Sequence, residues 1–209
     1  MHVHTIPATI HGRYVVRDGP PERLLLGFHG YAQTAEKSLA DLELIPGASD
    51  WTIVAIQALS RFYLGRTPET VASWMTSQDR ELVIADNINY VRSVVARLPP
   101  AETIVVAGFS QGAAMAYRAA AHLDRVVGII ALGADVPRDV TGPLPPLLIG
   151  RGERDQWYGE EKFKKDLKSL EGRAVVRTVV FDGLHEWTDA FRSAAGEFLA
   201  RLLTRQYVD

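Results

Sequence analysis

The stretch VVAGFSQGAAMAYRAAA, residues 105–121, places a serine between two glycines where two sequence patterns meet. A β-branched apolar run leads into the pentapeptide GFSQG (108–112), and an alanine-rich run leads out of it. The first run is typical of a buried strand and the second of a closely packed helix. A sharp strand-to-helix turn of this composition exposes the serine hydroxyl above the end of the strand. The pattern therefore predicts Ser110 as a nucleophile, with the Gln111 amide at the helix start facing a developing negative charge.

Apolar runs and helical patterns alternate along the rest of the chain. Strands are predicted at 22–30, 51–58, 103–110, 126–134, 145–153 and 174–183, and helices at 36–45, 79–98, 111–123, 159–171 and 187–204. Short apolar strands separated by helices predict an α/β fold with a mostly parallel central sheet and helices on both faces. An antiparallel edge strand is expected at 10–16, with a turn at 17–23. No linker or repeat divides the chain, so a single domain over 1–209 is expected.

Composition excludes several classes of protein. The 23 basic and 25 acidic residues give a formal net charge of -2, which argues against nucleic acid or an anionic membrane as the main partner. The absence of cysteine excludes disulfides, thiolate metal ligands and a cysteine nucleophile. The amino terminus does not resemble a signal peptide, and no apolar run approaches the roughly 20 residues that span a bilayer. A soluble, cytoplasmic protein is expected.

A serine hydroxyl becomes a good nucleophile when a histidine accepts its proton and a carboxylate orients that histidine. In a sheet of this type the chain order is serine, acid, histidine. His185 lies in the loop GLHEW (183–187), directly after a predicted strand, and is the expected base. His122 is a poorer candidate because it lies at the far end of the serine's own helix.

Three aspartates follow predicted strands after the serine. Asp155 ends the turn GRGERD (150–155) and is the favoured acid. Asp135, after the preceding strand, remains an alternative. Asp182 is too close in sequence to the histidine loop to come from a separate strand end, so it is expected to form a turn.

A second donor to the developing oxyanion is expected from the loop after the first parallel strand. His29 and Gly30 end that strand, and the Tyr31 amide would face the carbonyl oxygen. His29 is expected to hold the loop by hydrogen bonds rather than to bind a metal. The remaining amino-terminal histidines lie in an unpatterned segment without acidic partners, so no metal site is expected.

With these residues in place, the chain resembles the α/β-hydrolase superfamily, and within it the phospholipase/carboxylesterase group that includes acyl-protein thioesterases. The resemblance rests on four motifs: FHGYAQTAEKS (28–38), GFSQGAAMA (108–116), GRGERD (150–155) and GLHEW (183–187). It implies an α/β-hydrolase fold without a large cap domain and no cofactor. It also implies one set of roles: Ser110 as nucleophile, Asp155 as orienting acid, His185 as base, and the Tyr31 and Gln111 amides as the oxyanion hole.

The chain departs from this group in two places. The residues after His29-Gly30 differ from the usual Gly-Asp pattern, and the acyl-channel segment is reduced to about residues 59–78. The shorter segment argues against long-chain lipid substrates and depalmitoylation of proteins. Aromatic residues at predicted strand ends are expected either to line the mouth of a substrate pocket or simply to cap the sheet edge. Those assigned to substrate binding are Phe62, Tyr63, Trp74, Trp157 and Trp187.

The favoured function is a serine-dependent carboxylic ester hydrolase acting on short to medium acyl or aryl esters. A lysophospholipase or acyl-thioesterase, a serine peptidase with the same triad, and a binding protein that keeps the triad geometry are the alternatives. The expected partner is a small-molecule ester, and nothing in the sequence chooses between a monomer and a homodimer.

Overall fold

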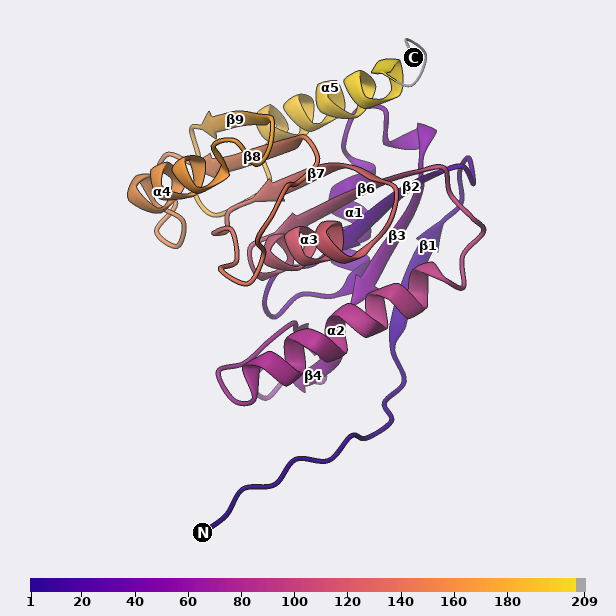
Figure 1. Cartoon of the computed structure of the whole chain (residues 1–209), viewed down its shortest axis with the longest axis vertical. Helices are drawn as coiled ribbons and strands as arrows, with labels where there is room; N and C mark the ends of the chain where they lie inside the picture. Colours follow the sequence, from indigo (N-terminus) through magenta and orange to yellow (C-terminus); the bar gives the residue numbers. More distant parts are fainter. Residues whose placement is uncertain (206–209) are drawn as a thin grey trace.

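The structure, a computed structural model, describes residues 1–205 and is built around a seven-stranded sheet (Figure 1). The strand order is β1-β3-β2-β6-β7-β8-β9; β1 runs antiparallel to β3, and all other neighbours run parallel. The strands are β1 (Arg13–Arg17), β2 (Arg23–Phe28), β3 (Thr52–Gln57), β6 (Thr103–Phe109), β7 (Val126–Leu132), β8 (Leu147–Gly152) and β9 (Val176–Phe181).

Helices cover both faces of this sheet because successive strand residues point to opposite sides. In β2, Leu24 and Leu26 pack into one core, whereas Leu25 packs into the other. The first core lies under α2 (Arg80–Val95), α3 (Gln111–His122) and α4 (Glu160–Leu170). The second lies under α1 (Ala35–Glu43) and α5 (Asp189–Arg205), with a short 3-10 turn, η1 (Ala48–Asp50), beside α1.

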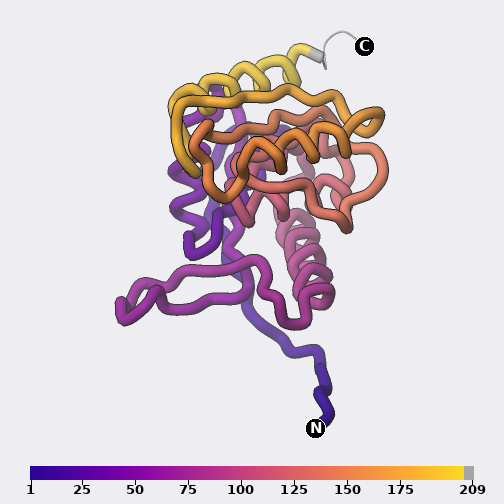
Figure 2. The backbone as a smooth tube through the Cα atoms, turned by 90° about the vertical axis from the view of Figure 1, so that its left-hand side faces the viewer, coloured from indigo at the N-terminus to yellow at the C-terminus, as the bar shows by residue number. Residues whose placement is uncertain are grey.

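The predicted parallel strands and the helices between them are all present, with ends that differ by a few residues. The edge strand is also present, but it pairs with β3 and not with the next strand along the chain. A two-stranded antiparallel hairpin, β4 (Ser60–Tyr63) with β5 (Thr70–Ser73), was not expected and projects from the body of the molecule (Figure 2). These two strands are four residues long, too short for a clear alternating pattern.

The parallel strands β2, β6, β7, β8 and β9 all end at the same edge of the sheet (Figure 1). Ligands of open α/β sheets bind at this edge, outside the carboxyl ends of the strands. In the described part of the chain, no helix is both long and apolar enough to cross a membrane.

Candidate active site

Ser110 occupies a strained turn between β6 and α3. Its backbone has φ 53° and ψ −126°, a conformation that residues with a side chain rarely adopt. The Ser110 amide donates to Leu132 O at 2.8 Å, which ties the turn to the end of β7. The two flanking glycines make the turn possible, since a Cβ on Gly108 would lie 2.3 Å from Gly112 O, and one on Gly112 would lie 2.1 Å from Phe28 O.

Gly112→Ala is expected to destabilise the protein by about 3 kcal/mol, because the new methyl group would meet backbone atoms of β2 that cannot move aside. The matched control is Gly159→Ala, where the nearest atom to a new Cβ is 3.9 Å away. That variant is expected to stay within about 1 kcal/mol of the wild type. Urea denaturation of both variants measures the difference, and equal stabilities would contradict the close packing of the turn.

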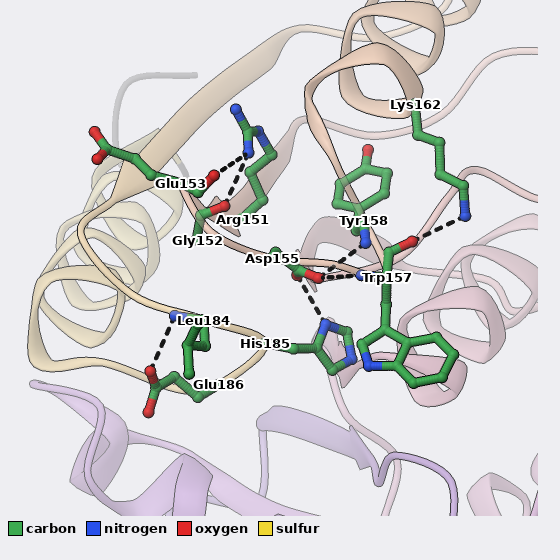
Figure 3. Close-up of polar contacts among 10 residues, drawn as sticks. All are labelled: Arg151, Gly152, Glu153, Asp155, Trp157, Tyr158, Lys162, Leu184, His185 and Glu186. Carbon is green, nitrogen blue, oxygen red and sulfur yellow. Dashed lines mark hydrogen bonds and ion pairs between the residues drawn. The ribbon is translucent and has the colours of Figure 1, made fainter.

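Asp155 and His185 form a hydrogen-bonded pair at the ends of neighbouring strands (Figure 3). His185 Nδ1 lies 2.7 Å from Asp155 Oδ2, and the Asp155 side chain is almost completely buried. Asp155 Oδ1 accepts the amides of Trp157 at 2.8 Å and Tyr158 at 2.9 Å. An ionised carboxylate can only accept, so Nδ1 of His185 carries the proton and Nε2 keeps a free lone pair.

The loop between β9 and α5 brings His185 next to the serine turn. Its ring lies 4.8 Å from the ring of Phe109, the residue before Ser110. On another side it lies against Gly133, where an added Cβ would be 2.8 Å from His185 Cε1. Gly133 follows Leu132, the residue that accepts the Ser110 amide. Among residues 1–205, no hydrogen bond joins Ser110 Oγ to His185, although such bonds are often long before substrate is bound.

The other candidate acid and base lie elsewhere. The Asp135 side chain is 53% exposed, and its nearest cationic partner is Lys162 at 3.8 Å. Asp182 is exposed and pairs with Arg154. His122 is bonded through Nδ1 to Arg118 O at the end of α3. None of these is the partner of His185, which is Asp155.

The loop after β2 packs against the serine turn and carries the free amide of Tyr31. A Cβ on Gly30 would lie 3.1 Å from the Phe109 ring, and Ala32 adopts φ 55° within the turn. The amides on either side of Tyr31 are both bonded, Gly30 N to Gln33 Oε1 and Ala32 N to Ala72 O. Within the described chain, the amides of Tyr31 and Gln111 donate to no other residue. Both are therefore available to a ligand.

His29 holds this loop from inside the protein, in agreement with the structural role expected for it. Its Nε2 accepts the Ala58 amide at 3.0 Å, so Nδ1 carries the proton and donates to Gly30 O at 2.7 Å. Burial lowers the pKa of His29 from 6.5 to about 4. The imidazole is thus neutral at physiological pH. No cluster of three or more His, Cys, Asp or Glu side chains that could hold a metal occurs within residues 1–205.

The lowered pKa of His29 predicts a loss of stability in acid. Between pH 6.5 and about 4 the unfolded chain binds a proton at His29 that the folded protein does not bind. Stability therefore falls as the pH falls through this window, by about 2 to 3 kcal/mol from this residue. His29→Gln should flatten the dependence of the unfolding free energy on pH, whereas the exposed His122→Gln should keep the wild-type slope. Equal slopes in all three proteins would contradict the assignment.

The Gln111 side chain has a role that the sequence did not reveal. Its Oε1 accepts from Trp74 N at 2.7 Å and Ser73 Oγ at 3.2 Å, and its Nε2 donates to Met75 O at 3.0 Å. These bonds fasten the segment after β5 to the start of α3. A glutamine after the serine was visible in the sequence, but its partners lie 36 to 38 residues away.

Trp74 corrects part of the prediction for the aromatic residues. It is fully buried between the rings of Phe28 and His29, at 5.4 and 5.2 Å, and its Nε1 donates to His29 O. Trp74 therefore belongs to the core and cannot contact a ligand from solvent. Its hydrogen bond to His29 O supports the loop after β2.

The remaining predicted aromatics separate into three environments. Trp187 packs against Phe191 of α5 at 5.4 Å, in the second core. Phe62 and Tyr63 lie on the projecting hairpin, where Phe62 contacts Tyr31 at 5.5 Å and Tyr63 is 68% exposed. Of the five residues, Trp157 lines the cavity beside Ser110. Of these five residues, Trp74 is therefore excluded from a substrate pocket and Trp187 is used in packing.

The comparisons with known proteins find similar folds but no similar sequence. No protein-family model matches the sequence, and no curated protein is similar to it in sequence. In contrast, the structure superposes on the Bacillus cereus carboxylesterase with a TM-score of 0.72 at 16% identity, covering 91% of this chain and 94% of that one. The chain has the α/β-hydrolase fold.

Two further solved structures share this fold. The acyl-protein thioesterase 2 of Zea mays matches with a TM-score of 0.74 at 16% identity, over 92% of this chain and all of that one. A phospholipase/carboxylesterase from Dyadobacter fermentans matches with a TM-score of 0.71 at 22% identity, over 92% and 98%. The predicted fold class is confirmed, and no large cap domain is inserted between the described strands and helices.

Proposed function

We propose that this α/β-hydrolase chain is a serine-dependent carboxylic ester hydrolase. The observation that carries the proposal is the Asp155–His185 hydrogen bond, 2.7 Å long, formed beside the strained Ser110 turn. Three structural neighbours named as esterase, thioesterase or phospholipase/carboxylesterase support the same reaction class.

The reaction proceeds in two steps through an acyl-enzyme. His185 Nε2 accepts the Ser110 proton as Oγ bonds to the ester carbonyl carbon, and the Tyr31 and Gln111 amides donate to the resulting oxyanion. Collapse of this intermediate breaks the ester bond, and the imidazolium returns the proton to the departing alcohol. A water molecule, deprotonated by the same imidazole, then attacks the acyl-enzyme and releases the acid and free Ser110.

Each supporting residue has a defined part in these steps. Asp155 keeps the proton of His185 on Nδ1 and stabilises the imidazolium. The two backbone amides of Trp157 and Tyr158 fix the orientation of the Asp155 carboxylate. The hydrogen bond from the Ser110 amide to Leu132 O holds the strained turn that presents Oγ at the sheet edge.

We further propose short to medium acyl groups, because residues 59–78 contain only a narrow hairpin and its flanking turns. The test is labelling with a fluorophosphonate, followed by mass spectrometry, together with turnover of 4-nitrophenyl esters from acetate to palmitate and of an acyl thioester. Labelling at Ser110 with a maximum at short chains supports the proposal. A maximum at long chains would overturn the assigned acyl length, labelling without turnover of any ester would favour a peptidase or a binding protein, and an unlabelled Ser110 would contradict the nucleophile.

A further inference from the structure

A charged cavity of about 740 Å³ lies beside Ser110. It is bounded by the start of α3, the loop after β7, the start of α2 and one side of α4. Five cationic side chains line it: Arg80, Arg118, Arg138, Lys162 and Lys165. Three acidic side chains also line it: Asp135, Asp139 and Asp166. The lining carries two more positive than negative groups, although the whole chain has a formal charge of -2.

The acidic groups are largely occupied by partners within the protein. The buried Arg118 guanidinium binds Asp139 through two hydrogen bonds, 2.6 and 2.7 Å long, and these lower the pKa of Asp139. Asp166 accepts from Val136 N at 3.0 Å and from the Tyr158 hydroxyl at 2.7 Å. Burial raises the pKa of Asp166, and the nearby positive charge of Lys165 acts in the opposite direction. Arg118 and Asp139 neutralise each other, so four cations and two acids, Asp135 and Asp166, remain in the lining, which keeps its net positive charge.

Three of the cations are not held by a direct bond to an acid, although Arg80 lies within electrostatic range of Asp139 and Lys165 within range of Asp166. Arg80, Arg138 and Lys165 are exposed, and none of them forms an ion pair or hydrogen bond with any residue of the described chain. They come from three different elements: the first residue of α2, the loop after β7 and the middle of α4. Lys162 donates a hydrogen bond to Trp157 O at 2.9 Å and lies 3.8 Å from Asp135. Several cations on separate elements that face one cavity form an electrostatic site for an anion.

We propose that the substrate carries an anionic group, a carboxylate or a phosphate, which binds Arg80, Arg138 and Lys165 while its ester carbonyl lies at Ser110. This inference rests on the proposed hydrolase function and narrows its substrate class. A guanidinium binds either anion through paired hydrogen bonds, and an ammonium contributes a compact charge. This site adds charged groups to the cavity that the predicted aromatic residue Trp157 also lines.

The test compares esters that differ only in one charge. Mono-4-nitrophenyl adipate and methyl 4-nitrophenyl adipate have the same acyl chain and leaving group, so the ratio of their kcat/KM values reports recognition of the carboxylate. We expect the anionic ester to be favoured by about 10-fold or more at low salt, and the ratio to fall as NaCl is raised to about 0.5 M.

Two triple variants with the same change of charge locate the effect. Arg80→Gln, Arg138→Gln and Lys165→Gln together should bring the ratio close to one. The control, Arg66→Gln, Arg92→Gln and Lys168→Gln together, removes three cations that do not line the cavity and should keep the wild-type ratio. An equal fall in both triple variants would show a general effect of net charge and would overturn the site.

Two further substrate pairs test whether the site recognises a carboxylate or a phosphate, and whether the charge lies on the acyl or the alcohol side of the ester. 4-Acetoxybenzoate is compared with its methyl ester, and 4-acetoxyphenyl phosphate with its dimethyl ester, which moves the charge to the alcohol side. A preference for at least one of the three anionic esters over its neutral partner supports the inference and identifies the anion, provided that the triple variant of Arg80, Arg138 and Lys165 loses this preference. Turnover of neutral esters without any such preference overturns the inference but does not contradict the proposed hydrolase function. Failure of Ser110 to react with the fluorophosphonate would instead contradict the hydrolase function itself.

Discussion

Ser110→Ala is expected to lower kcat/KM for a 4-nitrophenyl ester by about 10⁴-fold or more, because no acyl-enzyme can form without Oγ. Amides of the oxyanion hole would remain and would leave only residual activity. The side chain is partly exposed and contributes little packing, so the free energy of unfolding should change by less than about 1 kcal/mol. Steady-state kinetics with circular dichroism and urea denaturation of the same sample measure both effects.

Ser93→Ala is the matched control for this loss of a hydroxyl. Ser93 lies on α2, where its Oγ donates to Asn89 O at 2.8 Å, and it takes no part in the site. This variant should retain full activity. A folded Ser110→Ala protein with wild-type turnover would remove the nucleophile from the mechanism.

Asp155→Asn is expected to lower kcat by about 10³- to 10⁴-fold while the protein stays folded. The Trp157 and Tyr158 amides need an acceptor, so the carbonyl oxygen of the substituted side chain would take the place of Oδ1. The side-chain amide nitrogen would then face His185 Nδ1 as a donor. This arrangement favours the tautomer with a proton on Nε2, which cannot accept the Ser110 proton.

Asp135→Asn provides the comparison, because Asp135 was the alternative acid and lines the cavity beside Ser110. Its carboxylate is not bonded to His185, so its loss should change kcat by less than about 10-fold. Kinetics of the two variants on a neutral ester decide between the acids. A larger loss in Asp135→Asn than in Asp155→Asn would contradict the pairing.

Local sequence patterns were sufficient to predict most of the architecture. The alternation of apolar runs with helical periodicity predicted the parallel strands and the helices between them, because both patterns reflect which side of a strand or helix faces a core. The GFSQG turn (108–112) could also be recognised in the sequence. Its two glycines are required because a Cβ at either position would collide with backbone atoms. The hairpin of β4 and β5 was not predicted because its strands are short and one of them pairs with a single residue, Gln33, of the loop after β2.

The environment of each side chain depended on contacts between distant segments. Nothing in the sequence near Trp74 distinguishes a ring that lines a pocket from one that is buried against Phe28, 46 residues earlier in the chain. In the same way, the separate positions of Arg80, Arg138 and Lys165 do not indicate a common cavity until α2, α4 and the loop after β7 are placed together.

The sequence by itself determined the α/β order of elements and the serine turn, because backbone strain and amphipathic periodicity are properties of a few neighbouring residues. Only the tertiary structure decided which carboxylate meets His185, which aromatic rings are buried and which charges surround Ser110. Those outcomes depend on strand order and helix packing, which bring together residues that are far apart in the chain.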